Sequence, residues 1–443
     1  MRNVLPPTAT NAGSRIISVI LSALLICLNV SAQEKSQKVF TEDIDNFWVA
    51  FDSIQATNDS LRQIHFIKTL YIDKGSQGLK AFMLLRSYSA EGWVQLINRS
   101  PKFWASVRPN TLATKDKAPM IEASIRRFKE LYPQLSDAKM YFTVGGLRSG
   151  GTTMRNLILV GSEIATATKN TDVSDLPEGT AKWLGGVFKE QGLDNIVPLN
   201  IHEYVHTQQR GDPKSLLGRS IKEGSCDFIT ELVMGNPMQN NYIQYGRLHN
   251  KELAEKFKLE MFNTNFSNWL GNGSRAKTMA DLGYYMGYAI CKSYYSNSSD
   301  KKNAIKEIIE LNYTDSAAVE NFLIASKFYS EPLNKAELRA QFEAIRPRVI
   351  SIDPLKKDST ATPDVKELKI VFSTAMDGGI SIVRGKETYP ITEIVGFSED
   401  KTSCTLKVKL EPGSIYDFIM TDYGFISATG YPLKLYRVKF RTP

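Results

Sequence analysis

The sequence predicts a multidomain α+β protein, in which a mainly helical domain with a small sheet is followed by an all-β sandwich. Three observations support this prediction. Apolar residues recur at helical spacing through most of residues 36–345. Glycine-rich, β-type runs interrupt that pattern at 139–165, and beyond Pro347 the apolar period changes to two. The length of 443 residues and the hydrophobic content of 42% are ordinary for two or three folding units.

The first segment is expected to be a secretory signal peptide, covering residues 1–32, and no part of the fold. Arg2 and Arg15 precede the apolar run IISVILSALLICLNV, and the small residues at its end, up to Ala32, suit a signal peptidase. The run is shorter than the roughly 20 residues that span a bilayer. We therefore expect cleavage after Ala32, secretion to the periplasm, cell envelope or medium, and no transmembrane segment in the mature chain.

Charge and cysteine content narrow the class of protein further. The formal net charge of +8 falls to +6 without the two signal arginines (8 − 2), and basic residues are scattered along the chain. No nucleic-acid-binding module is recognisable, so nucleic acid is not an expected partner. Cys226, Cys291 and Cys404 remain after cleavage, too few for a disulfide framework. Whether Cys226 and Cys291 pair is open at this stage.

Residues 36–135 are predicted to be helical. The stretch TEDIDNFWVAFDSI opens with a threonine that can cap a helix, and it places Ile44, Phe47 and Phe51 at helical spacing. The stretch APMIEASIRRFKELYPQL repeats the pattern and is expected to end near Pro133. Both stretches read as helices that pack the core.

The stretch KMYFTVGGLRSGGTTMRNLILVGSEIA, at 139–165, contains two β-type runs around a glycine-rich turn. A phosphate-binding loop is one interpretation, but no Lys-Ser or Lys-Thr pair follows the glycines. A hairpin at a sheet edge is the favoured prediction.

The helical spacing and the strand-type alternation of apolar residues also predict the remaining elements. Helices are predicted over 196–210, with Pro198 in the first turn where its missing N–H costs little, and over 217–233, 280–296 and the stretch NKAELRAQFEAI. After these, apolar and polar residues alternate in strands separated by turns rich in proline, glycine and aspartate. This pattern predicts a β-sandwich that begins near residue 346.

The stretch IHEYVHTQQR carries two of the four histidines of the chain, His202 and His206. Positions i and i+4 lie on one face of a helix, so both imidazoles can bind one ion. Glu203 lies about 100° around the helix from His202. It is poorly placed to be a ligand, but it can reach a water molecule at the metal. These are the requirements of a metal-activated hydrolase.

The stretch KEGSCDF, a short way beyond these histidines, offers the remaining groups of such a site. Glu223 is the candidate third ligand, on a helix that can run antiparallel to the first. Asp227 lies four residues later on the same face, where it can accept the second N–H of a ligating histidine.

The stretch GYYMGYAICKSYY supplies Tyr284, Tyr285 and Tyr288 on one helix. Tyr284 is the candidate for stabilising the negative charge that develops on a substrate carbonyl. The alternative is that all three tyrosines pack the core. Gly283 and Gly287 would let this helix approach another closely.

These residues carry a family resemblance. The pattern H-E-x-x-H followed by E-x-x-x-D resembles the gluzincin class of zinc metallopeptidases, which is thermolysin-like in its ligand set. The wider context, with FWVAFDSI, YIDKGSQGLKAFM, GGLRSGG, VGSEIA, HEYVHTQQ, EGSCDF and GYYMGY, is similar to a bacterial family described only as zinc-dependent proteases of otherwise unknown function. This similarity covers about residues 38–345.

The resemblance implies roles for individual residues. Zn²⁺ would be held by His202, His206 and Glu223, with Asp227 orienting a histidine. Glu203 would be the general base and then the proton donor to the leaving amine. A strand within 154–162 would be the edge to which a substrate peptide adds. The histidine-to-glutamate spacing is shorter than in thermolysin, so the substrate pocket of that enzyme is not carried over.

The C-terminal stretches PRVISIDPLKKDS, LKIVFSTAM, EPGSIYDFIM and SATGYPLKLYRVKFRT resemble a bacterial Ig-like domain of the S-layer type, over about 347–443. No catalytic cluster is recognisable among them. The resemblance implies a spacer or adhesive module that contacts the cell envelope.

The sequence therefore predicts a signal peptide at 1–32, a gluzincin-like domain at 33–345 and an Ig-like sandwich at 346–443. The expected function is a secreted or envelope zinc-dependent peptidase that acts on peptides or proteins. Two alternatives remain open. One is a non-catalytic envelope protein, for binding or structure, with a structural metal site. The other is a zinc amidase that acts on cell-wall peptides. Glu203 argues against a purely structural site, which needs no carboxylate beside its first histidine.

Overall fold

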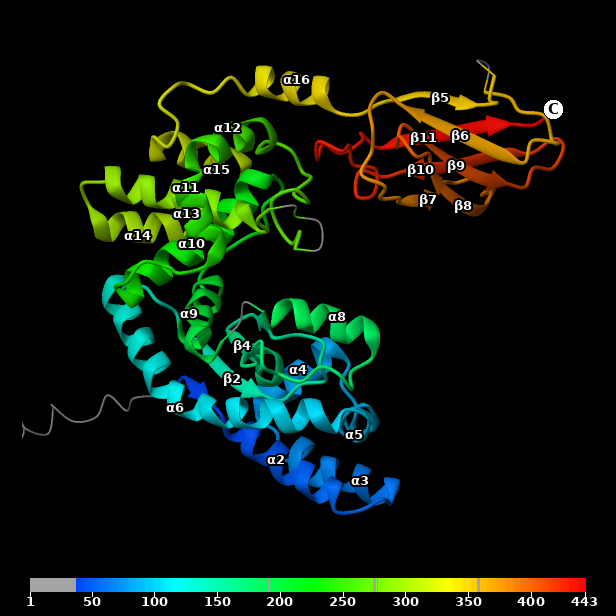
Figure 1. The fold of residues 1–443 in the computed structure, drawn as a ribbon. Helices are drawn as coiled ribbons and strands as arrows, with labels where there is room; N and C mark the ends of the chain where they lie inside the picture. The colour runs from blue at the N-terminus through cyan, green and yellow to red at the C-terminus, as the bar shows by residue number, and fades with distance from the viewer. Residues whose placement is uncertain (1–36, 190–191, 274–275, 277, 357–358) are drawn as a thin grey trace, which may run out of the picture.

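The computed structural model describes residues 37–443, except 190–191, 274–275, 277 and 357–358. Helices and a small sheet form the first three quarters of this part, and antiparallel strands form its end, so the protein is a multidomain α+β protein (Figure 1). The expected signal peptide lies outside the described residues. Among the described helices, none combines the length and apolar character needed to cross a membrane.

The predicted N-terminal helical region is confirmed. Its helices are α2 (Glu42–Gln55), α3 (Ser60–Phe66), the π-helix η1 (Ile67–Ile72), α4 (Gln77–Arg86), α5 (Ala90–Arg99) and α6 (Pro101–Leu131). The side chains of Asp59, Ser76 and Ser89 cap α3, α4 and α5 by accepting backbone N–H groups. Thr41 precedes α2, but its side chain makes no cap hydrogen bond.

The sheet corrects the predicted hairpin. Its strands are β1 (Val39–Phe40), β2 (Lys139–Thr143), β3 (Gly151–Met154) and β4 (Leu157–Gly161), in the order β1-β2-β4-β3. The two β-type runs, β2 and β4, are parallel neighbours, whereas the hairpin joins β3 to β4 through a turn in which Arg155 has φ of 56°. The glycine-rich segment leads from β2 to β3. The edge strand is therefore β3, and most of the run at 154–162 is the internal strand β4.

A buried carboxylate holds the glycine-rich segment at the end of the sheet. Glu163 lies in the short helix α7 (Ser162–Ala165) and is fully buried. Its side chain accepts the N–H groups of Gly145 (2.8 Å) and Leu147 (3.2 Å). These hydrogen bonds satisfy backbone groups that would otherwise be buried without partners, and they fix the path of the chain toward β3.

Further helices follow the sheet and share one hydrophobic core with it. They are α8 (Glu178–Val187), the 3₁₀ turn η2 (Leu193–Asn195), α9 (Ile196–His206), α10 (Leu216–Met234), α11 (Asn241–Leu248), α12 (Asn250–Glu260), α13 (Leu282–Asn297), α14 (Lys301–Ile309), α15 (Ser316–Ser326) and α16 (Lys335–Ile345). A Cβ at Gly287 would lie 1.7 Å from the carbonyl oxygen of Ser220, so glycine permits the close approach of α10 and α13. The predicted close packing at Gly287 is confirmed.

The C-terminal strands form two antiparallel sheets. One has the order β5 (Val349–Asp353), β6 (Glu367–Phe372), β9 (Ser403–Val408) and β8 (Ile391–Phe397), and the other has the order β11 (Tyr436–Arg441), β10 (Ile415–Met420) and β7 (Ile382–Arg384). Alternate side chains of β6, β9 and β11 are buried, as the period of two predicted.

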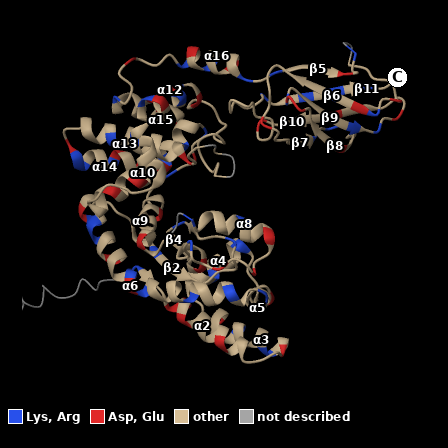
Figure 2. Cartoon of the chain, viewed as in Figure 1, with Lys and Arg blue, Asp and Glu red and all other residues tan. Residues whose placement is uncertain are grey.

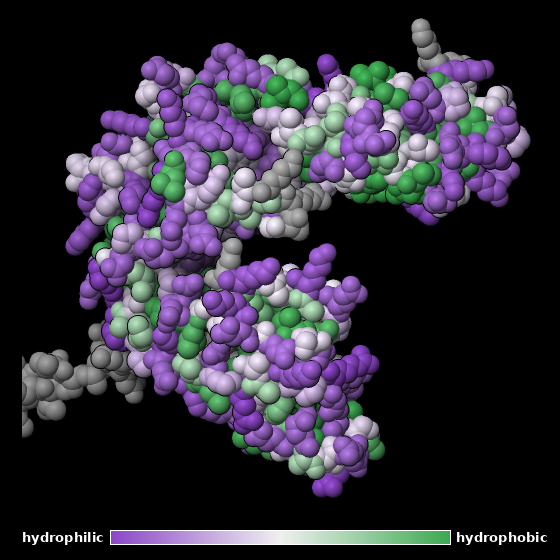
Figure 3. Space-filling view, in the orientation of Figure 1, coloured by the Kyte–Doolittle hydropathy of each residue, from purple (hydrophilic) through white to green (hydrophobic). Residues whose placement is uncertain are grey.

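Two hydrophobic cores divide the described chain. The first runs from Val39 to Leu338 and the second from Ala361 to Phe440. The sequence-predicted boundary near residue 346 falls between them. Lys and Arg positions are interspersed with Asp and Glu positions along both parts (Figure 2). Within the helical part, the small sheet with α2–α8 lies on one side and α10–α15 lie on the other (Figure 1). The surface is hollowed between these two sides (Figure 3).

Candidate metal site

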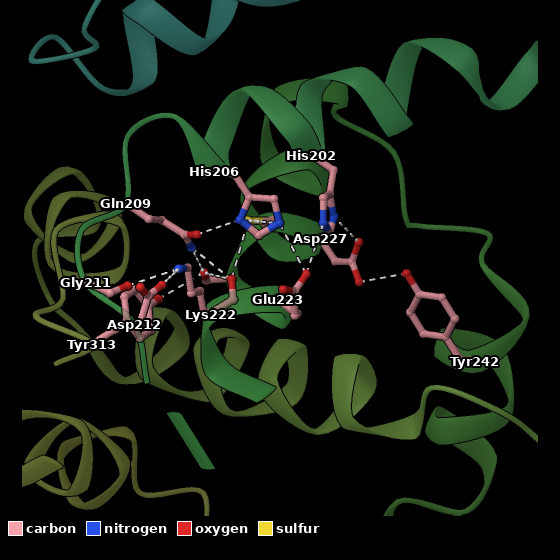
Figure 4. A network of polar contacts seen from close by, with 12 residues as sticks. His202, His206, Gln209, Gly211, Asp212, Lys222, Glu223, Asp227, Tyr242 and Tyr313 are labelled. Atoms are coloured by element: carbon pink, nitrogen blue, oxygen red, sulfur yellow. Dashed lines mark hydrogen bonds and ion pairs between the residues drawn. The ribbon is translucent and has the colours of Figure 1, made fainter. Parts of the chain in front are cut away.

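Two neighbouring helices bring the predicted ligands together. His202 and His206 project from α9, and Glu223 and Asp227 project from α10 (Figure 4). The imidazole rings are 4.9 Å apart between centroids. The close contact of α10 with α13 sets the position of Glu223, because a Cβ at the adjoining Gly224 would lie 2.0 Å from the backbone nitrogen of Tyr288.

Hydrogen bonds select the tautomer of each histidine. The Nδ1–H of His202 donates to the Asp227 carboxylate (2.8 Å), which also accepts the hydroxyl proton of Tyr242 (2.9 Å). The Nδ1–H of His206 donates to the amide oxygen of Gln209 (2.7 Å). The amide nitrogen of Gln209 donates to the carbonyl of Lys222, which fixes the orientation of the amide. Each Nε2 therefore faces the Glu223 carboxylate, as a donor when the ring is protonated and with a lone pair when a cation takes the place of that proton.

The two Nε2 atoms converge on one carboxylate oxygen. Glu223 Oε2 lies 3.2 Å from Nε2 of His206 and 3.6 Å from Nε2 of His202. Ligands about 2.1 Å from a tetrahedral zinc ion stand roughly 3.4 Å apart. The two observed separations lie close to that value, so His202, His206 and Glu223 fit ligands of one bound metal ion.

A cysteine adjoins the same histidines. The ligand atoms of His202, His206 and Cys226 lie within 4.8 Å of one another, so this buried group could also hold a metal ion. However, the Cys226 sulfur lies 3.3 Å from Nδ1 of His206 and 3.8 Å from Nε2. An atom that shares an ion with Nε2 must be nearer to Nε2 than to Nδ1. Cys226 does not meet this condition toward His206, whereas Glu223 approaches Nε2 itself at 3.2 Å.

Two carboxylates face the histidines of the site. Burial alone would lower the pKa of His202, but the carboxylates of Asp227 and Glu223 outweigh it and raise that pKa well above its ordinary value. Burial alone would raise the pKa of Glu223, but hydrogen bonds from His202 and His206 hold it well below its usual range. Glu223 is thus ionised beside the two imidazoles, an electrostatic setting that a cation stabilises.

Glu203 adjoins a cavity between α9 and the sheet. The cavity has a volume of about 180 Å³ and lies between the edge of the sheet and the helix. Its walls are mainly apolar and consist of Gly150, Gly151, Ile158, Val160, Ala165, Leu199, Asn200 and Glu203. Glu203 is partly exposed, and Leu199, one turn before His202, is 41% exposed. The cavity therefore joins the candidate base to the edge strand.

Tyr284 lies over the first histidine, and its two neighbours on α13 do not. The rings of Tyr284 and His202 are stacked, with centroids 6.2 Å apart. Burial and the Glu223 carboxylate raise the pKa of Tyr284 above its ordinary value, so its hydroxyl stays protonated and can donate. The hydroxyl of Tyr285 instead donates to Asn250 (2.8 Å), and that of Tyr288 donates to Glu231 (2.8 Å).

The structure also adds residues that the sequence analysis missed. Gln209 follows the histidine motif by one helical turn, and its position in HEYVHTQQ is the only signal that could have pointed to it. Tyr242 comes from α11 and has no such signal. Cys226, Cys291 and Cys404 are free thiols, so Cys226 and Cys291 do not pair. Of the two other histidines, His65 is exposed and the ring of His249 stacks on Tyr245.

Comparison with protein-family profiles gives no match to this chain, nor does comparison with curated proteins. Among solved structures, the chain aligns with the S-layer protein rSbsC at 14% identity and a TM-score of 0.17, covering 90% of this chain and 44% of that one. The N-terminal part of the bacterial S-layer protein SbsC aligns at 14% identity and a TM-score of 0.17, covering 74% and 79% of the two chains. The chain thus spans less than half of the first of these proteins, and such low scores carry no argument about fold or function.

Proposed function

We propose that this protein is a zinc-dependent peptidase of the gluzincin type, secreted or held at the cell envelope. The observation that carries the proposal is the convergence of His202 Nε2 (3.6 Å) and His206 Nε2 (3.2 Å) on Glu223 Oε2. Their orientation by Asp227 and Gln209 supports it, because ligating histidines donate their second N–H to such acceptors. Zinc bound there would polarise a substrate carbonyl and a water molecule.

Other residues of the chain supply the general base, the donor to the oxyanion and the substrate-binding strand. Glu203 takes the proton of the attacking water and returns it to the leaving amine. The hydroxyl of Tyr284 donates toward the oxygen that gains negative charge. An extended peptide adds to β3, the edge strand, and places one apolar side chain in the cavity beside Glu203. The walls of that cavity favour a leucine- or phenylalanine-sized residue next to the cleaved bond.

The test uses residues 33–443 loaded with zinc and an unstructured protein substrate whose cleavage releases new amino groups. Glu203→Gln is expected to lower kcat by about 10²–10⁴-fold, because the general base is lost, and to keep the bound metal. The control is Glu252→Gln, which removes an exposed carboxylate on α12 and should be fully active.

Other outcomes would reassign the protein. Zinc bound without hydrolysis of proteins, while cell-wall stem peptides are cleaved in a Glu203-dependent way, would make it an amidase. Bound zinc with no hydrolysis of either substrate would leave a structural metal site in a binding protein.

A further inference from the structure

The β-sandwich touches the helical part through a particular segment, the residues between α12 and α13. The amide of Asn265 donates to the carbonyl and carboxylate of Asp422 (both 3.3 Å), and the amide of Asn268 donates to the carbonyl of Gly430. Arg346, directly after α16, adds a contact by donating to the carbonyl of Pro432 (2.8 Å). Figure 1 shows the loop that precedes β11 turned toward the helical part.

Hydrogen bonds continue from this contact to the start of α13. The carbonyl of Asn268 accepts from the side-chain amide of Asn272 (2.8 Å), whose oxygen accepts the N–H of Asp281 (2.8 Å). The carbonyl of Asp281 then accepts the N–H of Tyr284 (3.0 Å). Asn272 is 6% exposed, so its hydrogen bonds are shielded from competing water.

The start of α13 has a backbone that needs such support. Asp281 has φ of 59°, in the left-handed region that non-glycine residues rarely adopt. Its carboxylate accepts the N–H of Gly271 (2.6 Å), and the carbonyl of Trp269 accepts the N–H of Gly283 (2.8 Å). The first turn of α13 is therefore held by the segment that the sandwich contacts, and not by a side-chain cap.

We propose that the sandwich is a positioning element for the candidate site, acting through Asn268 on Tyr284. By anchoring Asn268, the loop around Gly430 fixes the segment that sets the first turn of α13 and so holds the Tyr284 ring against His202. Asn268 is a positioning residue, because it touches neither the metal ligands nor the cavity beside Glu203. The catalytic consequence rests on the proposed peptidase function, whereas the structural coupling does not.

The two sides of the contact can be changed separately in the full chain. Asn268→Ala removes the amide on the helical side, which also donates to Glu260 (3.1 Å), so Gly430→Ala is the variant that isolates the sandwich. Gly430→Ala acts from the sandwich side, because Gly430 has φ of +93° and a side chain there is strained. The control is Lys434→Ala, which removes an exposed interface ion pair with Glu343 (3.7 Å) outside the hydrogen-bonded series.

Hydrogen exchange at the backbone amides of Gly283 and Tyr284 is the first readout. Both Asn268→Ala and Gly430→Ala are expected to speed exchange there by about tenfold, because local opening of the first turn becomes easier. Lys434→Ala should leave it unchanged. The proposal is overturned when Gly430→Ala speeds exchange only within 425–433 and leaves Gly283 and Tyr284 as in the wild type. The same holds if Asn268→Ala folds and exchanges normally at these two amides.

The second readout separates this proposal from the peptidase proposal. With a peptide substrate, Asn268→Ala is expected to lower kcat about tenfold with little change in KM, because Tyr284 acts on the transition state. Faster exchange without any wild-type hydrolysis would support the coupling and reject the peptidase. Hydrolysis that both variants retain in full, with unchanged exchange, would reject the coupling alone.

Discussion

Two buried aspartates, one in each part of the molecule, show how similar groups can have different uses. Asp417 in the sandwich is fully buried and accepts the N–H of Lys386 (2.8 Å) and the guanidinium of Arg437 (Nε, 2.8 Å). Asp227 in the helical part is 1% exposed and accepts from His202 and Tyr242. Arg437 has only donors, so the sandwich pair is complete in itself. His202 offers a second nitrogen with a lone pair, so its network is complete only when that nitrogen meets a proton or an ion.

The comparison teaches where to look for function among buried charges. A buried carboxylate with an arginine partner stabilises the fold locally. A buried carboxylate that orients an imidazole toward a second imidazole and a second carboxylate prepares a binding site. The predictions below test this distinction, beginning with the largest expected effect.

The largest effect is expected for Glu223→Gln. The substitution removes an anionic ligand from the point where the two Nε2 atoms converge, and it should lower zinc affinity by more than the roughly 100-fold upper range for outer partners. Mass spectrometry of the native protein should find about one zinc per wild-type chain and almost none in the variant. A full complement of zinc in Glu223→Gln would assign the third ligand elsewhere, with Cys226 the first candidate.

Two further variants show how the loss of zinc affinity depends on the distance of the carboxylate from the metal. Asp227→Asn should weaken zinc binding by about 10–100-fold, because it removes an orienting acceptor and leaves the ligand atoms in place. Asp417→Asn, the matching change in the sandwich, should leave zinc binding unaltered.

A third buried carboxylate, Glu163, extends the comparison, because among the described residues its hydrogen-bond partners are backbone N–H groups and not a cation. Burial raises the pKa of Glu163 to about 7. An acid whose folded-state pKa is raised contributes stability below its unfolded pKa of about 4.5 and loses it as pH rises to 7. Stability relative to Glu163→Gln should therefore fall by on the order of 3 kcal/mol between pH 4.5 and 7, because one pKa unit corresponds to about 1.4 kcal/mol.

Denaturant unfolding of both proteins across this pH range measures the difference. Glu178→Gln, which changes an exposed carboxylate on α8, is the control and should show no such slope. A stability difference that stays flat from pH 4.5 to 7 would mean that Glu163 ionises normally in its buried position.

Gly224→Ala tests whether close packing of α10 and α13 sets the position of Glu223. The new methyl group would meet the backbone nitrogen of Tyr288 at 2.0 Å, so the helices must separate. We expect a loss of stability of about 2–3 kcal/mol, together with weaker zinc binding. Gly179→Ala is the control, because nothing lies within 4 Å of its added Cβ, and it should stabilise α8 slightly. Unchanged zinc affinity in a Gly224→Ala protein that still folds would show that the contact of α10 with α13 does not set the position of Glu223.

The smallest effect on the site is expected for Arg437→Ala. Asp417 would keep its backbone donor and lose its cation, so the unfolding midpoint of the sandwich should fall. Zinc content should stay at the wild-type level, because the pair makes no contact with the ligands. A parallel loss of zinc would show that the two parts unfold as one unit.

The sequence predicted the local features of the site well, because they depend on periods within one or two helices. His202, His206, Glu223 and Asp227 lie on the predicted faces of α9 and α10, and the structure brings all four together. The helical and strand-type spacings of apolar residues also located the main elements and the change to β-strands at the C-terminus. The assignment to the gluzincin type remains a proposal.

Features that depend on long-range pairing were not predictable in this way. A parallel pair and a hairpin have the same alternation of apolar residues, so nothing local indicated that β4 would insert between β2 and β3. Tyr242 reaches Asp227 from a different helix, and the contact of Asn268 with Gly430 joins residues from the two parts of the molecule. Such contacts are set by tertiary packing and leave no spacing in the sequence.

The buried Asn272 has a practical consequence for making the protein. It begins the triplet Asn-Gly-Ser, the acceptor for N-linked sugar in hosts that glycosylate secreted chains. Sugar is attached to the same amide nitrogen that donates to the carbonyl of Asn268 in the folded protein. A glycan added there during secretion would prevent the segment before α13 from closing. Expression in bacteria that do not add N-linked sugar is therefore the route to a correctly folded chain, and the glycosylated product is expected to misfold.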